Sequence, residues 1–187
     1  MVKQSKNQVK IIAGTHRGSN IHFPSVEGLR PTPARVRETL FNWLGQDLTG
    51  FSVLDLFAGS GALGMEASSR GAKEVVMVDR SAVSCKSLRD NLIRLQFPNI
   101  IIQKMNAEDY LQIQKQKRFD IVFLDPPFNY SSWENLLRLL NPSLMNDAFI
   151  YVEAATMPEV QNKAFELIKS GCAGVSRQYL FQFNKVG

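Results

Sequence analysis

The sequence has few of the residues that build metal sites and disulfide frameworks. Its two cysteines, Cys85 and Cys172, lie far apart, form no C-x-x-C pair and are accompanied by only two histidines, His16 and His22. This pattern predicts two reduced, partly buried thiols rather than a zinc site or a structural disulfide. We therefore expect no metal in the functional site.

Long apolar runs are scarce too. No stretch approaches the roughly 20 consecutive apolar residues that a membrane helix requires, and the start MVKQSKNQVK lacks the apolar centre of a secretory signal. These absences predict a cytoplasmic protein with no membrane partner. A chain of 187 residues is also long enough to bury a core without covalent staples, and nothing in it requires more than a monomer.

Positive charge is confined to one end of the chain. The formal net charge is +5, and the first 40 residues account for all of it, because the remainder has equal numbers of acidic and basic side chains. A localised basic region indicates a polyanionic partner. The arginines in this region are Arg17, Arg30, Arg35 and Arg37.

The first 50 residues predict a small hairpin followed by a helix. VKIIAG and NIHFP read as two short strands around the turn THRGS, and LRPTPARVRETLFNWL then opens a helix with one apolar face. Thr32 is the expected N-cap and Pro33 the first helical residue. Docking of the apolar face would leave Arg35 and Arg37 on other faces.

From residue 51 onward, strands and helices alternate, which predicts an α/β fold. We expect a mainly parallel sheet covered by helices on both faces, and we divide the chain into an extension, residues 1–50, packed on a main domain, residues 51–187. Near the end we expect a helix over residues 158–169 and a strand pair, residues 173–177 and 179–183, that is antiparallel.

The acids at the ends of the strands point to a ligand site. In parallel sheets of this kind the ligand crevice lies at the carboxyl ends of the strands. Asp55, Asp79 and Asp125 each follow an apolar run at such an end. We therefore expect the three carboxylates to share one crevice.

The segment DLFAGSGALG contains Gly59-x-Gly61-x-x-Gly64 between a strand and a helix, with Asp79 ending the next strand. This is the pattern of a dinucleotide-binding turn, so an NAD-dependent oxidoreductase is one interpretation. Asp55 disfavours it, because a second carboxylate near the turn repels a pyrophosphate. No substrate domain follows either.

S-adenosylmethionine fits these residues better, because it has an ammonium and a sulfonium and no phosphate. Asp79 would hold its ribose, Asp55 and the glycine-rich turn its methionine end, and the segment after the third strand its adenine. The candidate cofactor-binding residues are Asp55, Phe57, Ala58, Gly59, Gly61, Gly64, Asp79, Arg80, Asn106, Ala107 and Glu108.

The stretch FLDPPF ends a predicted strand with an acid, two prolines and an aromatic residue. Asp125 and the carbonyl of Pro126 are placed to accept hydrogen bonds from an exocyclic amine on a nucleobase, which turns the nitrogen lone pair toward a methyl donor. Pro127 stiffens the turn, and Phe128 offers a stacking face for a flipped base. The motif alone leaves guanine, adenine and cytosine open.

The chain resembles the RsmD family of bacterial 16S ribosomal RNA guanine-N2 methyltransferases from about Val9 to Phe183. The resemblance is carried by IIAGTHRG, LRPTPARVRETLFNWL, DLFAGSGALGMEASSRGA and DIVFLDPPF. It implies a class I methyltransferase fold, a Rossmann-like three-layer sandwich with seven strands, the last antiparallel, behind an N-terminal hairpin. It also implies methyl transfer from S-adenosylmethionine to one guanine in the small ribosomal subunit, with Arg17, Arg30, Arg35 and Arg37 as candidate RNA contacts.

Two departures from the family pattern concern the cofactor ribose and the hairpin. Members often have Glu at the position of Asp79, which keeps the acid but changes its reach. Their first hairpin is commonly richer in arginine and has Trp in the turn, where this chain reads THRGSN with His16 and Ser19. The match is thus weaker in the hairpin than in the cofactor motifs.

The main alternative is an N6-adenine methyltransferase acting on RNA or DNA, since an acid with two prolines and an aromatic residue serves that amine equally well. Protein amide methylation prefers Asn at the position of Asp125. A non-catalytic RNA-binding module is a further reading of the basic end.

Overall fold

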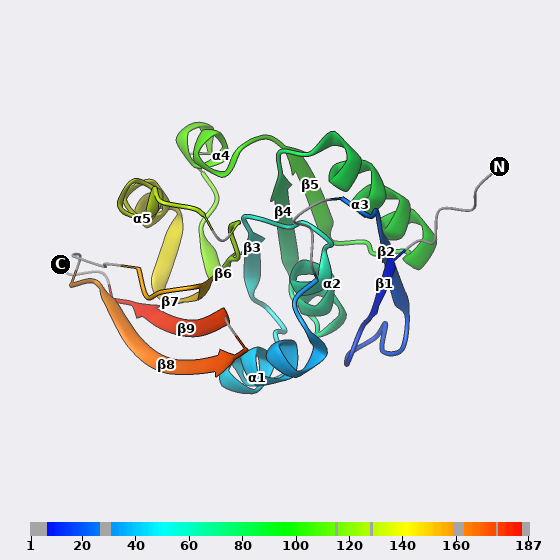
Figure 1. The fold of residues 1–187 in the computed structure, drawn as a ribbon, viewed down its shortest axis with the longest axis horizontal. Coiled ribbons are helices and arrows are strands. Elements are labelled where there is room, and N and C mark those ends of the chain that lie inside the picture. Colours follow the sequence, from blue (N-terminus) through cyan, green and yellow to red (C-terminus); the bar gives the residue numbers. More distant parts are fainter. Residues whose placement is uncertain are drawn as a thin grey trace.

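The structure is a computed structural model that describes residues 7–26, 31–114, 116–127, 129–158, 163–174 and 176–184. Two short strands and a helix precede an alternation of strands and helices (Figure 1). The elements are β1 (Asn7–Lys10), β2 (Asn20–Phe23), α1 (Ala34–Leu44), β3 (Ser52–Asp55), α2 (Ala62–Ser69), β4 (Glu74–Asp79), α3 (Ala82–Leu95), β5 (Ile100–Lys104), α4 (Ala107–Ile113), β6 (Phe119–Leu124), α5 (Trp133–Leu140), a 3-10 turn (Asn141–Ser143), β7 (Leu144–Ala154), β8 (Phe165–Ala173) and β9 (Ser176–Phe183).

The central sheet has seven strands in the order β5-β4-β3-β6-β7-β9-β8. Neighbouring strands from β5 to β7 pair in parallel, whereas β9 pairs antiparallel with both β7 and β8. The last strand is therefore the one that runs against the others. This confirms the predicted α/β fold with a seven-stranded, mainly parallel sheet and a separate N-terminal hairpin, β1 with β2.

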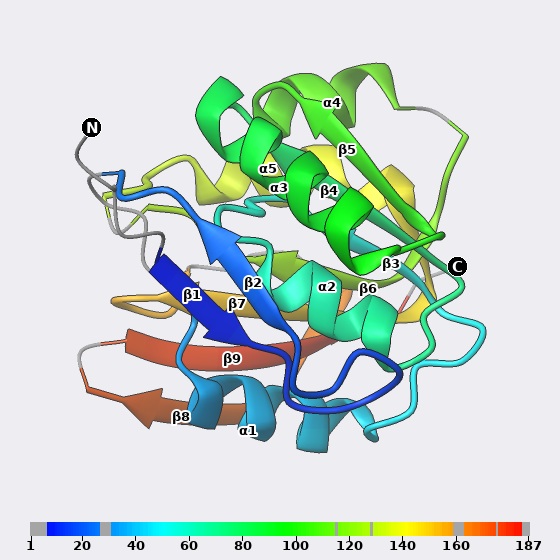
Figure 2. The same cartoon turned by 90° about the vertical axis from the view of Figure 1, so that its right-hand side faces the viewer.

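Helices cover both faces of the sheet because successive residues of a strand point to opposite sides. Leu54 packs into the layer that contains α4 and α5, and its neighbour Val53 packs into the layer that contains the hairpin, α1, α2 and α3. Figure 2 shows the hairpin lying along α2 and α3. In the described part of the chain no helix is long and apolar enough to cross a membrane.

The predicted helix over residues 158–169 is wrong where it can be compared, and residues 159–162 lie outside the described part. Phe165 begins β8, which pairs antiparallel with β9 and ends at a turn containing Gly174 (φ 64°). The expected strand over residues 173–177 does not form as one element, because Ala173 ends β8 and Ser176 begins β9. Pairing with β9 and the contact of Phe165 with Phe183 (ring centroids 5.2 Å apart) override the local helical propensity.

The start of α1 also differs from the expectation. Pro33 is the N-cap of the helix, no side chain caps it, and the first helical residue is Ala34. The Thr32 hydroxyl donates instead to the Asp125 carboxylate, at 3.4 Å. Thr32 therefore bonds to a residue that is distant in the sequence and does not cap the helix.

Glu66 in α2 joins three parts of the fold through one buried carboxylate. Its oxygens accept hydrogen bonds from the backbone N–H groups of Ile12 and Ala13 (2.8 and 3.0 Å) and form ion pairs with Arg37 and Arg70 (3.0 Å each). The loop after β1, helix α1 and the end of α2 are thereby held together.

The expectation that Arg37 lies on a free face of α1 is wrong. Its side chain is 1% exposed, and the guanidinium also donates to the carbonyls of Thr32 (3.2 Å) and Lys10 (2.9 Å). Arg37 supports the fold from inside and has no surface to offer to RNA. The apolar spacing of α1 could not reveal this, because the partner carboxylate comes from a distant helix.

We predict that Glu66→Gln lowers the free energy of unfolding by about 3–5 kcal/mol, because it leaves two arginines buried without a counter-charge. Urea unfolding followed by circular dichroism measures the change. Asp90→Asn is the matched control: it breaks the exposed ion pair with Lys86 (2.8 Å) and should cost less than about 1 kcal/mol. Equal losses in the two variants would contradict the assignment.

Candidate active site

A cavity of about 700 Å³ opens where β3, β4, β6 and β7 end. This volume lies within the range typical of small-molecule sites. Its lining comes from the glycine-rich turn, the ends of the strands, the segment before α1 and the loop before α5. The lining includes Thr32, Asp55, Phe57, Ala58, Gly59, Ser60, Asp79, Arg80, Asn106, Ala107, Glu108, Asp125, Pro126, Pro127, Tyr130, Glu153 and Ser176.

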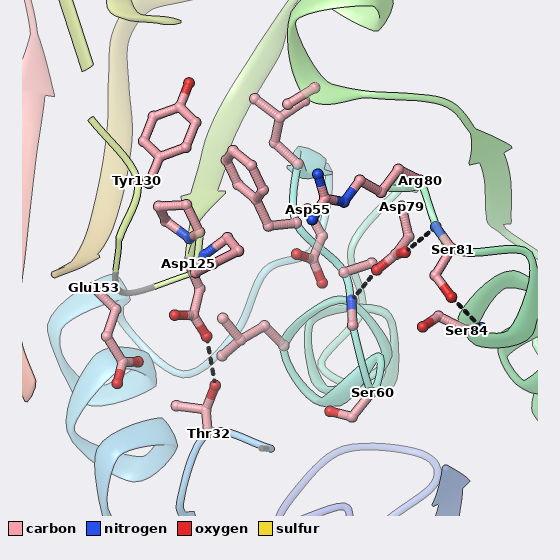
Figure 3. A pocket seen from close by; sticks show the side chains of 18 of the residues that line it. Thr32, Asp55, Ser60, Asp79, Arg80, Ser81, Ser84, Asp125, Tyr130 and Glu153 are labelled. Carbon is pink, nitrogen blue, oxygen red and sulfur yellow. Dashed lines mark hydrogen bonds between the residues drawn. The ribbon is translucent and has the colours of Figure 1, made fainter. Parts of the chain in front are cut away.

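Two carboxylates organise the glycine-rich turn (Figure 3). Asp79 accepts hydrogen bonds from the N–H groups of Gly59 (2.9 Å) and Ser81 (2.7 Å), and Asp55 accepts one from Gly64 N–H (2.9 Å). A carboxylate offers about four lone-pair sites, so each can accept further bonds from a ligand. The turn and the acids thus form one preorganised unit.

The three glycines of the motif have different tasks. Gly59 lines the cavity, and Gly61 caps α2 with a left-handed backbone (φ 83°). A Cβ on Gly64 would lie 2.9 Å from Met77 and 3.0 Å from the carboxylate of Asp55. Among the described residues, Gly61 and Gly64 are not part of the lining, so they shape the turn and the helix packing behind it.

The cavity wall has a marked excess of negative charge. Among the described residues, the wall contains Asp55, Asp79, Glu108, Asp125 and Glu153 and one basic residue, Arg80. Burial raises the pKa of Asp55 to about 7, the Gly64 N–H opposes this shift, and the charge of Asp79 adds to it. Burial, followed by the charges of Glu153 and Asp55, also holds the pKa of Asp125 well above its ordinary value. A cationic ligand would relieve this repulsion.

The acid and prolines of FLDPPF stand in the same cavity. Asp125 follows the end of β6, Pro126 is buried, and the Pro127 carbonyl accepts a hydrogen bond from Tyr130 N–H (2.9 Å). As Figure 3 shows, the hydroxyl of Thr32, in the segment before α1, donates to the Asp125 carboxylate. Phe128 lies outside the described residues, so its stacking role stays a prediction.

Tyr130 connects the loop after the prolines with the wall formed by α4. Its hydroxyl donates to Glu108 Oε1 (2.6 Å), and its ring meets Phe57 edge-on (centroids 5.6 Å apart). Asn106, Ala107 and Glu108, which were expected to line an adenine, all line the cavity beside it. An aromatic and polar wall of this kind suits a planar heterocycle.

Several lining residues escaped the sequence reasoning, above all Thr32, Tyr130, Glu153 and Ser176. Glu153 carried a usable signal, because it ends an apolar run in the same way as Asp55, Asp79 and Asp125. Thr32 and Ser176 carried none, since the fold alone brings the segment before α1 and the start of β9 to this cavity.

The basic residues expected to contact RNA lie in different parts of the structure. Arg35 is exposed, two residues after the lining residue Pro33. Arg17 is exposed in the hairpin turn, where the adjacent Thr15 and His16 contact Ser69 and Leu95 at the far ends of α2 and α3. Arg30 lies outside the described residues. Arg35 and Arg17 remain predicted RNA contacts.

The sheet order, the glycine-rich turn and the acid with two prolines define an S-adenosylmethionine-dependent methyltransferase of class I. A solved structure described as a putative SAM-dependent methyltransferase from Streptococcus mutans shares the fold, with a TM-score of 0.75 at 16% identity over 97% of this chain and 56% of that one.

The family follows from closer relatives. The model of the family "Conserved hypothetical protein 95" matches residues 9–182, and the chain belongs to this family. It is 40% identical over 184 residues to ribosomal RNA small subunit methyltransferase D of Haemophilus influenzae, covering 95% of each chain. It is 43% identical over 157 residues to the protein of the same name in Escherichia coli, covering 83% of this chain and 77% of the relative.

A solved structure from Escherichia coli, described as putative methyltransferase yhhF, is similar in fold as well as sequence. Its TM-score is 0.85 at 39% identity, and the match covers 95% of this chain and 99% of that one.

The residues present fit S-adenosylmethionine. Asp79 would hold the ribose hydroxyls, Asp55 and Gly59 the methionine end, and Glu108 with its neighbours the adenine. The cofactor would supply an activated methyl group on a sulfonium, whose positive charge suits the part of the wall that contains Asp55, Asp79 and Glu108. The described residues contain no cluster of side chains able to hold a metal ion.

We predict that affinity for S-adenosylmethionine rises as pH increases through about 7, because Asp55 must lose a proton to meet a cation. Below its pKa the effect approaches about tenfold per pH unit. The sign is opposite for the unliganded fold: the raised pKa of Asp55 stabilises the folded protein at low pH, and this contribution is lost as pH rises through about 7.

Titration calorimetry across this pH range measures the cofactor effect, and Asp55→Asn is the matched variant. It should bind more weakly at high pH and show a flatter profile, since ionisation of the cofactor itself is common to both proteins. Parallel profiles would rule out Asp55 as the titrating group.

Proposed function

We propose that this protein transfers a methyl group from S-adenosylmethionine to the exocyclic N2 amine of one guanine in the 16S RNA of the small ribosomal subunit. The observation that supports this most directly is the position of Asp125 and its prolines beside the acidic cofactor wall, in one cavity. The names of the relatives from Haemophilus influenzae and Escherichia coli support ribosomal RNA as the substrate class.

The side chains around Asp125 suit the chemistry of an exocyclic amine. Such an amine is a poor nucleophile because its lone pair is delocalised into the ring. Asp125 and the Pro126 carbonyl would each accept a hydrogen bond from N2, which directs the lone pair at the methyl carbon. The cofactor would supply the methyl group, and N2, which would carry a positive charge once methylated, would give up one proton to Asp125.

The environment of Asp125 suits the release of that proton. Burial and two neighbouring carboxylates raise its pKa, so it holds a proton more readily than an ordinary aspartate. The Thr32 hydroxyl, 3.4 Å away, orients the carboxylate without neutralising it. Closure of the cavity by Tyr130 and the prolines would exclude water from the methyl donor.

The site of action is proposed from the same substrate. A ribosomal RNA acceptor implies a cytoplasmic enzyme that meets the RNA in an assembled or assembling small subunit. The exposed Arg35, next to the cavity, would contact the phosphate backbone there, and a monomer suffices for every residue of the site.

The proposal predicts N2-methylguanosine as the product. Purified protein and labelled S-adenosylmethionine are incubated with small-subunit particles that lack the modification, with naked 16S RNA and with DNA, and the modified nucleoside is identified by mass spectrometry. N6-methyladenosine in its place would establish the adenine alternative, and labelling of no RNA would refute RNA methylation.

Asp125→Ala is the control variant of this assay. We expect turnover to fall by about 100-fold or more, since a group that stabilises developing charge is lost. Binding of S-adenosylmethionine should remain, because the cofactor wall is formed by other residues. Full activity of the variant would remove Asp125 from the mechanism.

We predict that Arg35→Ala weakens binding of small-subunit RNA and lowers the slope of log affinity against log salt by about one, as the loss of a phosphate contact requires. Filter binding at several salt concentrations measures the slope. Arg118→Ala is the matched control, because Arg118 is exposed just before β6, at the opposite end of that strand from Asp125. Identical salt slopes for the two variants would show that Arg35 makes no contact with an RNA phosphate.

A further inference from the structure

A second buried carboxylate lies beside Asp125, and the proposed chemistry does not use it. Leu124 of β6 pairs in register with Val152 of β7, so Asp125 and Glu153 are the next residues on two neighbouring parallel strands. Figure 3 shows both side chains on the side of the pocket away from Asp79 and Arg80. Glu153 therefore belongs to the half of the cavity that would receive the base.

Glu153 is held in a defined position. The residue is 8% exposed, and its two oxygens accept hydrogen bonds from the hydroxyls of Ser176 (2.6 Å) and Tyr151 (3.2 Å). None of the ion pairs among the described residues involves it. Each oxygen retains a lone pair, so this carboxylate can accept a further hydrogen bond from a ligand in the cavity.

The acceptors along the wall match the donors along the edge of guanine. Guanine presents the N2 amine and, directly next to it, the N1–H, and both are donors. Adenine presents an amine and an unprotonated N1, which is an acceptor. If the N2 amine of guanine binds Asp125, the adjacent N1–H would face the end of the neighbouring strand, where Glu153 lies. In adenine the unprotonated N1 would face a carboxylate lone pair instead, and two acceptors repel each other.

We infer that Glu153 accepts the N1–H of the target base and so selects guanine over adenine, with Ser176 and Tyr151 as the residues that position it. This inference rests on the proposed guanine-N2 activity. It assigns discrimination to β7 and β9, whereas methyl transfer depends on β3, β4 and β6.

The test uses 2-aminopurine, which has the N2 amine but an unprotonated N1. It replaces the target guanine, once nuclease mapping of the labelled RNA has located it, in 16S RNA reconstituted into small subunits. We expect the wild-type protein to prefer guanine by at least about tenfold in kcat/KM, because its carboxylate has no donor to meet on the analogue.

Glu153→Gln should reduce the effect of the analogue. It should gain on 2-aminopurine, since an amide N–H can donate to the unprotonated N1. On guanine it should lose less, since the neutral amide oxygen still accepts the N1–H, although more weakly than a carboxylate. The absence of O6 from the analogue affects both proteins equally. A purely structural role for Glu153 would lower both rates together and leave their ratio unchanged.

Glu166→Gln, on the exposed face of β8, is the control and should keep the wild-type ratio. Thermal unfolding and cofactor binding show whether Glu153→Gln is folded. If Glu153→Gln does not fold, the test rests on the wild-type protein alone. Equal kcat/KM values of the wild-type protein on guanine and on 2-aminopurine would then overturn the inference. An unchanged ratio in folded Glu153→Gln also overturns it and leaves guanine-N2 methylation intact, since the product assay tests that activity separately.

Discussion

The carboxylate of Glu66 is the contact on which the rest of the architecture depends. It is buried between Arg37 and Arg70 and binds the backbone after β1, so it joins the hairpin, α1 and α2 at one point. A buried ion pair of this kind is costly to break, because any missing partner leaves an uncompensated charge. Its position matters for the site: α2 follows the glycine-rich turn, and the residues just before α1 form the opposite wall of the cavity. One ionic cluster thus connects the two helices that adjoin these parts of the cavity lining.

The Glu66 cluster pairs one acid with two bases, whereas the cavity brings several acids together. Its carboxylates face one another with a single basic residue, Arg80, among the described lining, and the raised pKa values of Asp55 and Asp125 express the resulting repulsion. Such an arrangement favours binding of a cation on one side of the cavity and of hydrogen-bond donors on the other. The sheet order separates these acids: Asp55 and Asp79 end β3 and β4, whereas Asp125 and Glu153 lie at the ends of β6 and β7.

Local patterns and tertiary contacts contributed differently to what could be predicted. The glycine-rich turn and the acid with two prolines could be placed from the sequence because each is a local feature: a turn, a strand end and a stiffened backbone. The role of Arg37 was not legible, because its partner lies in another helix, and Thr32 was read as a helix cap although its hydroxyl points to Asp125. The helix over residues 158–169 failed for the same reason, since pairing between β8 and β9 outweighs the propensity of the segment.

By itself, the sequence determined the class of fold and placed the glycine-rich turn and Asp125 at the ends of strands, because alternating strands and helices place strand ends on one edge of a sheet. Only the tertiary structure decided which arginine is buried, which hydroxyl holds Asp125 and that Glu153 stands beside it. These depend on register and strand order, which bring residues 32, 125, 153 and 176 into one cavity. The spacing of these residues along the chain carries no trace of their proximity, because long-range pairing, rather than local preference, creates it.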